Sequence, residues 1–321
     1  MNLGEPVSLG FDIGGTNIRG IALRPDFSFG EMILHPCEDD QEKIIRTVVK
    51  LTDQIQEKEK LEIGCIGVGV AGFVDRSGVV QTSPNLSTFV DFPLLDKLRQ
   101  ELGIPVLIEN DATSATWAEV QLGVAKESQN VVMVCLGTGI GAGLYFNSEL
   151  FRGSAGYAGE VGHMTVMPDG LPCPCGRFGC WERYASGSSL GNIAEAMKLD
   201  GELGSLGSDS DETPFDSERI GHLALERNKE ALKVLGQYSN WVALGLVNLV
   251  NILDPELVVI GGGITELGEL LLDPVRKSFE NITPESSLRT KDMVVLAKFG
   301  KKSGAIGAAL LAKQKFLEDK R

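Results

Sequence analysis

Four potential metal ligands lie close together in the middle of the chain. His163 is followed by Cys173, Cys175 and Cys180, the three cysteines of the segment CPCGRFGC. Three thiolates and one imidazole complete the tetrahedral shell of a structural zinc site and leave no open position for a substrate. The glycines of the segment allow a sharp turn around one ion. An odd number of clustered cysteines favours a metal over disulfides, and three free thiols beside an unrelated histidine are the alternative.

Three glycine-rich segments could hold the phosphates of a nucleotide. They are Gly14–Asn17, Gly137–Gly141 and Gly261–Gly263. Glycine lets the backbone approach a phosphate closely, so that several N–H groups can point at it. Each segment taken alone is weak evidence, because a tight hairpin turn also explains a pair of glycines.

The best-known nucleotide motifs do not account for these glycines. The chain has no G-x-x-x-x-G-K-[ST] string, which excludes a P-loop. The strings that fit G-x-G-x-x-G or its looser form begin at Gly67 and Gly137. Both run into strand-like residues, whereas a dinucleotide site needs a helix N-terminus at that point. A dehydrogenase is therefore disfavoured.

Asp12 lies two residues before Gly14, the first residue of the first glycine pair. A carboxylate in this place could hold Mg²⁺ beside the phosphates, directly or through water. The alternative role is a hydrogen bond to the N–H groups of the turn itself.

The elements that carry these residues show an internal repeat. An apolar run, a glycine turn and a second apolar run occur at Val7–Leu23 and again at Val131–Phe146, which predicts two related domains that each open with a hairpin. A last helix, Gly304–Phe316, could return to the first domain, and Asp200–Asp216 is predicted to be an exposed loop. Periodicity and apolar runs predict the remaining helices at 39–60, 93–102, 113–122 and 228–252, and strands at 63–70, 106–108 and 257–260.

Composition limits the class of protein. The 321 residues, 43% apolar and 23% charged, indicate a folded chain with more than one domain. A net charge of −14 argues against nucleic acid as a partner, because phosphate binding needs clustered cations. The N-terminus does not read as a signal peptide, and the longest apolar run, Val242–Leu253, is too short to span a bilayer. These features favour a cytoplasmic enzyme that does not bind membranes.

Taken together, the motifs resemble those of the ROK sugar kinases, a family of bacterial hexokinases and related sugar-responsive repressors. The matching stretches are DIGGTN, VAGFVD, SPNL, ENDA, LGTGIGAG, GYAGEVGHM, CPCGRFGCWE and VIGGG. They run from near the N-terminus to beyond residue 260, and GEVGH together with CPCGRFGCWE is the most specific pair.

The resemblance implies an α/β protein with the actin-like ATPase (ribonuclease H-like) fold, in which two α/β domains enclose a cleft. The smaller domain is expected to comprise residues 1–112 and a C-terminal helix at about 304–321. The larger domain is expected at 113–303, with the zinc-binding segment at 163–180.

The resemblance also assigns ligands to residues. It places ATP and Mg²⁺ against Asp12, Gly14, Gly15, Thr16, Asn17, Gly137, Thr138, Gly139, Gly262 and Gly263. It places the sugar against Gly72, Asn85, Asn110, Asp111, Glu160, His163 and Glu182, so His163 would touch both zinc and sugar. A hexose presents a ring of hydroxyls, and a site of Asn, Asp, Glu and His side chains with few cations suits it.

The expected reaction is ATP-dependent phosphorylation of a hexose at its 6-hydroxyl, with glucose as substrate and Asp111 as general base. Fructose, mannose, allose, N-acetylglucosamine and N-acetylmannosamine are alternative substrates within the family. A sugar-sensing repressor is the alternative from another class. Such repressors carry an N-terminal helix-turn-helix, whereas the first hairpin here is predicted to start at Val7. Related kinases are commonly dimers or tetramers, so a homo-oligomer is expected.

Overall fold

A five-stranded sheet organises the first part of the chain. The strands are β1 (Val7–Ile13), β2 (Asn17–Leu23), β3 (Ile33–Pro36), β4 (Ile63–Val70) and β8 (Val106–Asn110), in the order β3-β2-β1-β4-β8. The hairpin β1–β2 is antiparallel, and β1, β4 and β8 run parallel. The central strands are buried on both faces, which explains their almost continuous apolar sequences.

The computed structural model describes residues 6–60, 62–204, 206, 214–285 and 287–318. It contains two compact units. The first comprises Met1–Glu127, Gly143–Gly159 and Lys301–Arg321, and the second comprises Ser128–Ala142 and Glu160–Gly300. None of the described helices is both long and apolar enough to cross a bilayer.

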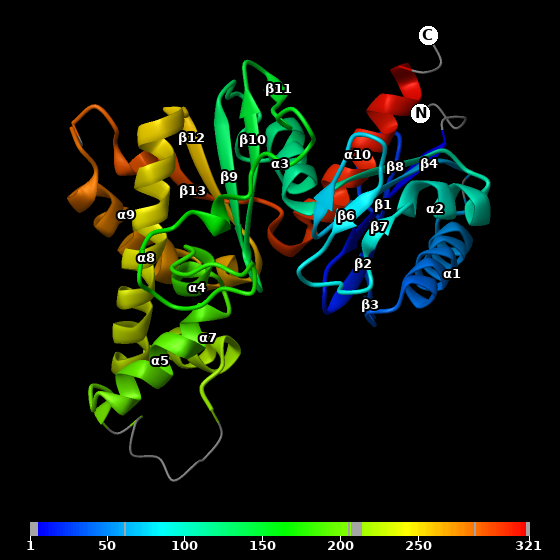
Figure 1. The fold of residues 1–321 in the computed structure, drawn as a ribbon. Coiled ribbons are helices and arrows are strands. Elements are labelled where there is room, and N and C mark those ends of the chain that lie inside the picture. Colours follow the sequence, from blue (N-terminus) through cyan, green and yellow to red (C-terminus); the bar gives the residue numbers. More distant parts are fainter. Residues whose placement is uncertain (1–5, 61, 205, 207–213, 286, 319–321) are drawn as a thin grey trace. The chain divides into compact units, whose positions relative to one another are not determined.

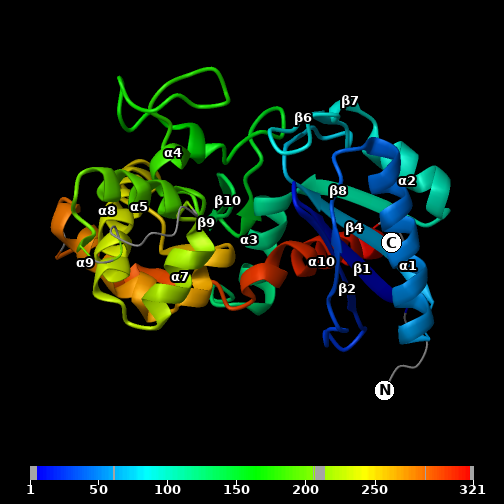
Figure 2. The same cartoon turned by 90° about the horizontal axis from the view of Figure 1, so that it is seen from below.

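Helices cover both faces of the sheet in the first unit (Figures 1 and 2). α1 (Gln41–Glu59) and α2 (Leu94–Leu102) lie on one face, and α10 (Ser303–Glu318) lies on the other. Asp40 precedes α1 as its N-cap, and its side chain accepts a hydrogen bond from the Lys43 N–H. A small antiparallel sheet, β5 (Phe73–Val74), β6 (Val80–Thr82) and β7 (Val90–Phe92), completes the unit.

Glycines allow α10 to approach the sheet and α3 (Asp111–Leu122) at backbone contact distance. A Cβ atom on Gly10 or Gly67 would lie 1.8 Å from the carbonyl oxygen of Ala305 or Ala308. A Cβ atom on Gly307 would lie 1.6 Å from the carbonyl oxygen of Ser114 in α3. α10 therefore packs closely on β1, β4 and α3.

The expected boundary after residue 112 differs from this division, because it falls inside α3. The whole of α3 belongs to the first unit, together with Gly143–Gly159. The close packing of α3 against α10 gives the physical reason. Arg152 adds an ion pair, 2.6 Å long, to Glu109 at the end of β8, which ties the 143–159 segment to the same unit.

Substituting the two helical glycines Gly307 and Gly236 by alanine is expected to have opposite effects. Gly307→Ala should destabilise the protein by about 3 kcal/mol, because the new methyl group meets backbone rather than a movable side chain. Gly236→Ala, in α8 (Lys229–Leu253), should stabilise it by up to about 1 kcal/mol, because no atom of the described residues, apart from the adjacent backbone of α8, lies within 4 Å of its added Cβ. Urea unfolding curves of the two variants measure both effects. Equal curves would contradict the packing described for α10.

A second five-stranded sheet repeats the strand arrangement. Its order is β11-β10-β9-β12-β13, in which β9 and β12, and β12 and β13, are parallel. By the division above, β9, β12 and β13 belong to the second unit, and β11 belongs to the 143–159 segment of the first. The strands are β9 (Val131–Leu136), β10 (Ile140–Phe146), β11 (Glu149–Leu150), β12 (Leu257–Gly261) and β13 (Val294–Leu296). The chain passes into the first unit's segment 143–159 within β10. The predicted repeat of a strand, a glycine turn and a strand is confirmed.

The long helices α8 and α9 (Glu269–Ile282) lie side by side (Figures 1 and 2). The shorter helices are α4 (Glu182–Ala185), α5 (Ser189–Leu199) and α7 (Ser217–Leu225). In the predicted exposed loop Asp200–Asp216, residues 205 and 207–213 lie outside the described residues. The prediction is wrong for Leu203, Leu206 and Phe215, which are buried because their apolar side chains pack into the second unit.

Candidate functional site

Asp12, at the end of β1, is the first predicted site residue in the first unit. The hairpin register pairs it with Arg19 on β2, and Arg19 Nη1 lies 3.2 Å from Asp12 Oδ2. The start of α10 reaches the same carboxyl, because a Cβ atom on Gly304 would lie 3.0 Å from Asp12 Cγ. Burial raises the pKa of Asp12, and Arg19 partly offsets this. Sequence reasoning missed Arg19, although the length of the hairpin turn would have placed it opposite Asp12.

Asp111 is the first residue of α3 and is largely buried. Burial, with the nearby Asp12 carboxyl as a second cause, raises the pKa of Asp111 to about 6. The N–H of Ala112 donates to Asp111 Oδ1 at 2.9 Å and opposes the shift. A carboxyl with this pKa is ionised at neutral pH and can accept a proton, which is the property that a general base requires.

Asn110 caps α3 and connects it to the loop that follows β4. Its side-chain oxygen accepts from the Thr113 N–H at 2.9 Å, and its Nδ2 donates to the carbonyl oxygen of Gly72 at 3.2 Å. Gly72 has φ +153°, and an added Cβ would lie 2.7 Å from the carbonyl oxygen of Thr82. Only glycine fits this position, so the Gly72 carbonyl is held where Asn110 can reach it.

The first glycine turn, Gly14–Asn17, is closed by a hydrogen bond from the Gly14 N–H to the Asn17 carbonyl at 3.0 Å. Gly15 and Thr16 are exposed. A Cβ atom on Gly15 would lie 2.9 Å from Asn85 Cβ, so the turn packs against the loop that carries Asn85. The structure therefore brings together Asp12, Asp111 and the predicted glycine, asparagine and threonine residues of the first unit.

Ser114 is a further polar residue of this cluster that sequence reasoning missed. Its hydroxyl is fully buried and has no hydrogen-bond partner among the described residues. A Cβ atom on Gly69 would lie 3.3 Å from this hydroxyl and 3.4 Å from Asp111 Cα, and Gly69 pairs with Asp12 across β1 and β4. No sequence signal distinguishes Ser114 from an ordinary helical serine.

In the second unit, the second glycine turn lies among other backbone segments. Its closing hydrogen bond runs from the Gly137 N–H to the Gly139 carbonyl at 3.0 Å. Ser188 Oγ donates to the carbonyl oxygen of Thr138 at 3.1 Å. Gly262 has φ +94°, and an added Cβ would lie 2.2 Å from the Leu136 carbonyl oxygen. The predicted nucleotide residues Gly137–Gly139, Gly262 and Gly263 are therefore neighbours, because Gly263 begins the short helix that follows Gly262.

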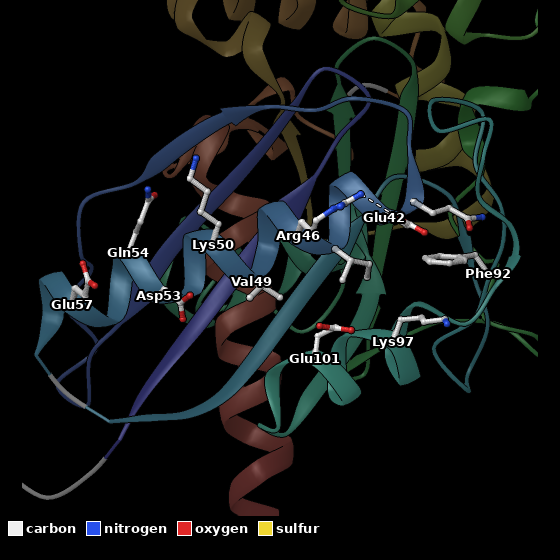
Figure 3. A pocket seen from close by; sticks show the side chains of 12 residues that line it. Glu42, Arg46, Val49, Lys50, Asp53, Gln54, Glu57, Phe92, Lys97 and Glu101 are labelled. Carbon is white, nitrogen blue, oxygen red and sulfur yellow. Dashed lines mark hydrogen bonds and ion pairs between the residues drawn. The ribbon is translucent and has the colours of Figure 1, made fainter.

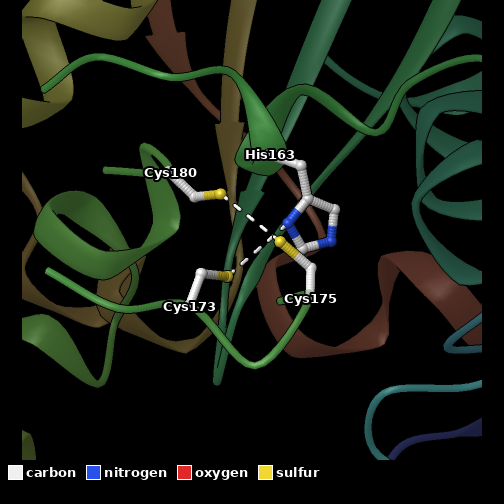
Figure 4. Close-up of side chains that lie close together, drawn as sticks. All are labelled: His163, Cys173, Cys175 and Cys180. Atoms are coloured by element: carbon white, nitrogen blue, oxygen red, sulfur yellow. Dashed lines mark hydrogen bonds between the residues drawn. The ribbon is translucent and has the colours of Figure 1, made fainter. Parts of the chain in front are cut away.

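The four predicted metal ligands converge in the same unit (Figure 4). One ligand atom from each of His163, Cys173, Cys175 and Cys180 lies within 4.8 Å of all the others. The Sγ atoms of Cys175 and Cys180 are 3.6 Å apart, and Cys173 Sγ is 3.9 Å from His163 Nδ1. A tetrahedral zinc ion with Zn–S bonds of ~2.3 Å would hold its ligand atoms about 3.8 Å apart. The cluster therefore fits a zinc ion.

Buried Trp181, which follows Cys180, anchors this loop. Its indole N–H donates to the Trp241 carbonyl at 2.8 Å, and Gly245 in α8 leaves room for the ring, because an added Cβ would lie 1.9 Å from it. Gly179 has φ +69° and an added Cβ would lie 1.6 Å from the Met167 carbonyl oxygen, so the turn before Cys180 requires glycine.

Two carboxylates predicted to contact sugar lie next to this cluster. Glu182 Oε1 is 3.5 Å from His163 Nδ1 and 3.1 Å from Cys173 Sγ. Glu160 Oε2 is 4.0 Å from His163 Nε2. Glu182 also borders the second glycine turn, since a Cβ atom on Gly139 would lie 2.7 Å from its Oε2. The cluster and the glycine turn are thus joined through one carboxylate.

A separate hollow of about 750 Å³ lies along α1 and α2 in the first unit (Figure 3). Its lining carries charges of both signs, including Glu42, Arg46, Lys50 and Glu101, besides the apolar Val49. None of the predicted site residues lines it.

Comparison with known proteins adds a family. The profile described as the ROK family matches residues 8–315. A glucokinase from Streptomyces coelicolor is 34% identical over 313 residues, which cover 96% of this chain and 98% of that protein. The xylose repressor of Bacillus subtilis is 28% identical over 318 residues, which cover 97% of this chain and 78% of the repressor.

A solved structure is also similar. The crystal structure of a ROK family glucokinase from Streptomyces griseus, in complex with glucose and AMPPNP, matches with a TM-score of 0.86 at 33% identity. The match covers 96% of this chain and 99% of that one.

Proposed function

Because this chain belongs to the ROK family, we propose that it is an ATP-dependent kinase that phosphorylates glucose at the 6-hydroxyl. Its actin-like ATPase fold is the one predicted from the sequence. The observation that carries the proposal is Asp111, a partly buried carboxyl whose pKa burial and the nearby Asp12 carboxyl raise to about 6. The glucokinases among its relatives, one of them solved with glucose and an ATP analogue, support the same reaction.

In the proposed reaction, Asp111 is the general base. The 6-oxygen of glucose forms a bond to the γ-phosphorus of ATP, and the bond from that phosphorus to the bridging oxygen of ADP breaks. The hydroxyl proton passes to the Asp111 carboxylate. Its pKa near 6 keeps Asp111 ionised at pH 7 and still basic enough to take the proton.

We propose that Asp12 and the two glycine turns hold Mg²⁺-ATP. Asp12 Oδ2 is paired with Arg19, whereas no described residue donates a hydrogen bond to Oδ1, so one carboxylate oxygen can take a water of the ion. Mg²⁺ neutralises charge on the phosphates when it is bound. The N–H groups of the turns at Gly14–Asn17 and Gly137–Gly139, with Gly262 and Gly263, are suited to bind the nucleotide.

We propose that His163, Cys173, Cys175 and Cys180 bind a structural zinc ion. The ion would hold His163 and the neighbouring Glu182 in fixed places and takes no part in phosphoryl transfer. Glu160, His163 and Glu182 are proposed to bind sugar hydroxyls, and the same role is proposed for Gly72, Asn85 and Asn110. His163 can serve both partners, because Nδ1 faces the thiols and Nε2 faces Glu160.

A coupled assay of ADP release with a panel of hexoses, and with ATP or polyphosphate as donor, tests the proposal. Glucose with ATP should give the highest kcat/KM. The similarity to a xylose repressor makes sugar sensing the second candidate. Binding of a sugar by calorimetry without turnover of any hexose would favour the sensor and contradict the kinase. We also expect the protein to be cytoplasmic and to form a homo-oligomer. Sedimentation of the purified protein tests the oligomeric state.

A further inference from the structure

The loop between β6 and β7 places Asn85 beside the first glycine turn. The loop has the sequence SPNLST, from Ser83 to Thr88, and Asn85 is exposed. A Cβ atom on Gly15 would lie 2.9 Å from Asn85 Cβ and 3.0 Å from the Asn85 carbonyl oxygen. The position of this loop therefore decides where the Asn85 amide can meet a ligand next to the turn.

Ser83 fixes the first end of the loop. Its buried hydroxyl donates to the Ala71 carbonyl at 2.6 Å and accepts from the N–H groups of Asn85 at 3.3 Å and Leu86 at 3.0 Å. This end is tied to residues of the same stretch of chain, between β4 and β7.

Asp39, just before α1, fixes the second end from a distant part of the sequence. Its Oδ2 accepts from the N–H and the hydroxyl of Ser87, at 2.8 and 2.6 Å. Its Oδ1 accepts from the N–H and the hydroxyl of Thr88, at 3.2 and 2.8 Å. Four donors from two consecutive residues thus converge on one carboxylate, and the side chain of Gln41 adds a bond to the Thr88 carbonyl.

The main effect of this arrangement is on the freedom of the loop. Asp39 and both of its partners are exposed, so water could satisfy the hydrogen bonds of all these groups if the contact were absent. The contact instead removes freedom from the loop before any ligand arrives. A loop that is already ordered does not have to be ordered at the time of binding, and this favours affinity.

We propose that Asp39 is a positioning residue that sets the affinity for the sugar by holding the Ser83–Thr88 loop, and with it Asn85, against the first glycine turn. The inference rests on the proposed hexose kinase function and adds a residue that touches neither the sugar nor the nucleotide. It predicts an effect on sugar binding that is separate from the chemical step, because Asp111 belongs to α3 and not to this loop.

The test is the steady-state kinetics of Asp39→Asn. Asparagine keeps one acceptor oxygen and turns an NH₂ group toward donors, so it can satisfy Ser87 or Thr88 but not both. The KM for glucose should rise about tenfold, while kcat and the KM for ATP change less than twofold. The double variant Ser87→Ala/Thr88→Val should raise the KM similarly, and combining it with Asp39→Asn should add little, as for residues that act through one contact.

Asp40→Asn is the matched control. It removes the adjacent carboxylate, which caps α1 by accepting from the Lys43 N–H at 2.8 Å, and asparagine caps helices equally well. Its kinetics should equal those of the unaltered protein. If the unaltered protein phosphorylates glucose and Asp39→Asn has the same KM for glucose, the inference is wrong and the proposed function stands. An unaltered protein that turns over no hexose would overturn the proposed function and the inference with it.

Discussion

We expect Asp111→Asn to lower kcat for glucose by about 10²–10⁴-fold and to change the KM for glucose little. Asparagine has nearly the same shape and can still accept the Ala112 N–H bond, but it cannot take a proton. Because only the base is lost, calorimetric glucose binding should persist. Asp53→Asn is the control, because Asp53 is an exposed residue of α1, and this variant should keep full activity. A variant of Asp111 with wild-type kcat would exclude it as the base.

The unaltered protein should show the same residue in its pH profile. The acidic limb of kcat/KM should have its midpoint near pH 6, the pKa to which burial and Asp12 raise the Asp111 carboxyl, with activity lost below it. A midpoint near the ordinary carboxyl value of 3.8 would contradict the burial described for Asp111.

Stability should respond in the opposite direction to activity. Between pH 3.8 and about 6 the folded chain holds a proton on Asp111 that the unfolded chain has released. Raising the pH through this window therefore costs up to about 3 kcal/mol of stability from this one group. Asp111→Asn should be more stable than the unaltered protein at pH 8 and no more stable at pH 3, which urea unfolding at the two pH values measures.

Loss of one zinc ligand should give the second large effect. Cys175→Ser is expected to lower the zinc content of chelator-free protein from about one ion per chain to almost none and to raise the KM for glucose at least tenfold. Cys175 is exposed and fills no part of the core, so the loss of the ion and not a packing defect would cause the change. The loop would then lose the contact that fixes His163 and Glu182.

Metal analysis by mass spectrometry and a colorimetric zinc indicator both measure the zinc content without depending on activity. Cys37→Ser provides the control, because this half-buried thiol belongs to the first unit and not to the cluster. A fully active protein without zinc, or a Cys175→Ser variant that keeps its metal, would refute the structural role.

Local patterns in the sequence predicted the parts of the site that lie within one turn or one loop. The hairpin around Gly14–Asn17 and the Cys–His cluster are of this kind, because a few residues of separation leave the chain little choice. The capping role of Asn110 also follows from its place just before a helix. In such cases the spacing fixes which side chains meet.

Contacts between distant segments were not accessible in the same way. Nothing in the sequence pairs Asp39 with Ser87 and Thr88. The same is true of the hydrogen bond from Ser303 Oγ in α10 to Oε1 of buried Glu119 in α3, which is 3.1 Å long. Strand glycines such as Gly10 and Gly67 indicate a close approach, but the partner depends on which helix the topology brings there. The expected domain boundary at residue 112 has the same weakness, because helical periodicity shows where α3 starts and not what it packs on.

The position of α10 has a consequence for biosynthesis. This helix, Ser303–Glu318, packs on the β1–β4 pair at Gly10 and Gly67, so these two strands must wait for their partner until the ribosome has made residues 303–318. Until then the nascent chain exposes an apolar sheet surface, which is a site for aggregation or for chaperones. Ribosome-stalled chains that end before residue 303 should therefore be digested by protease within the first unit, whereas released chains that include α10 should resist.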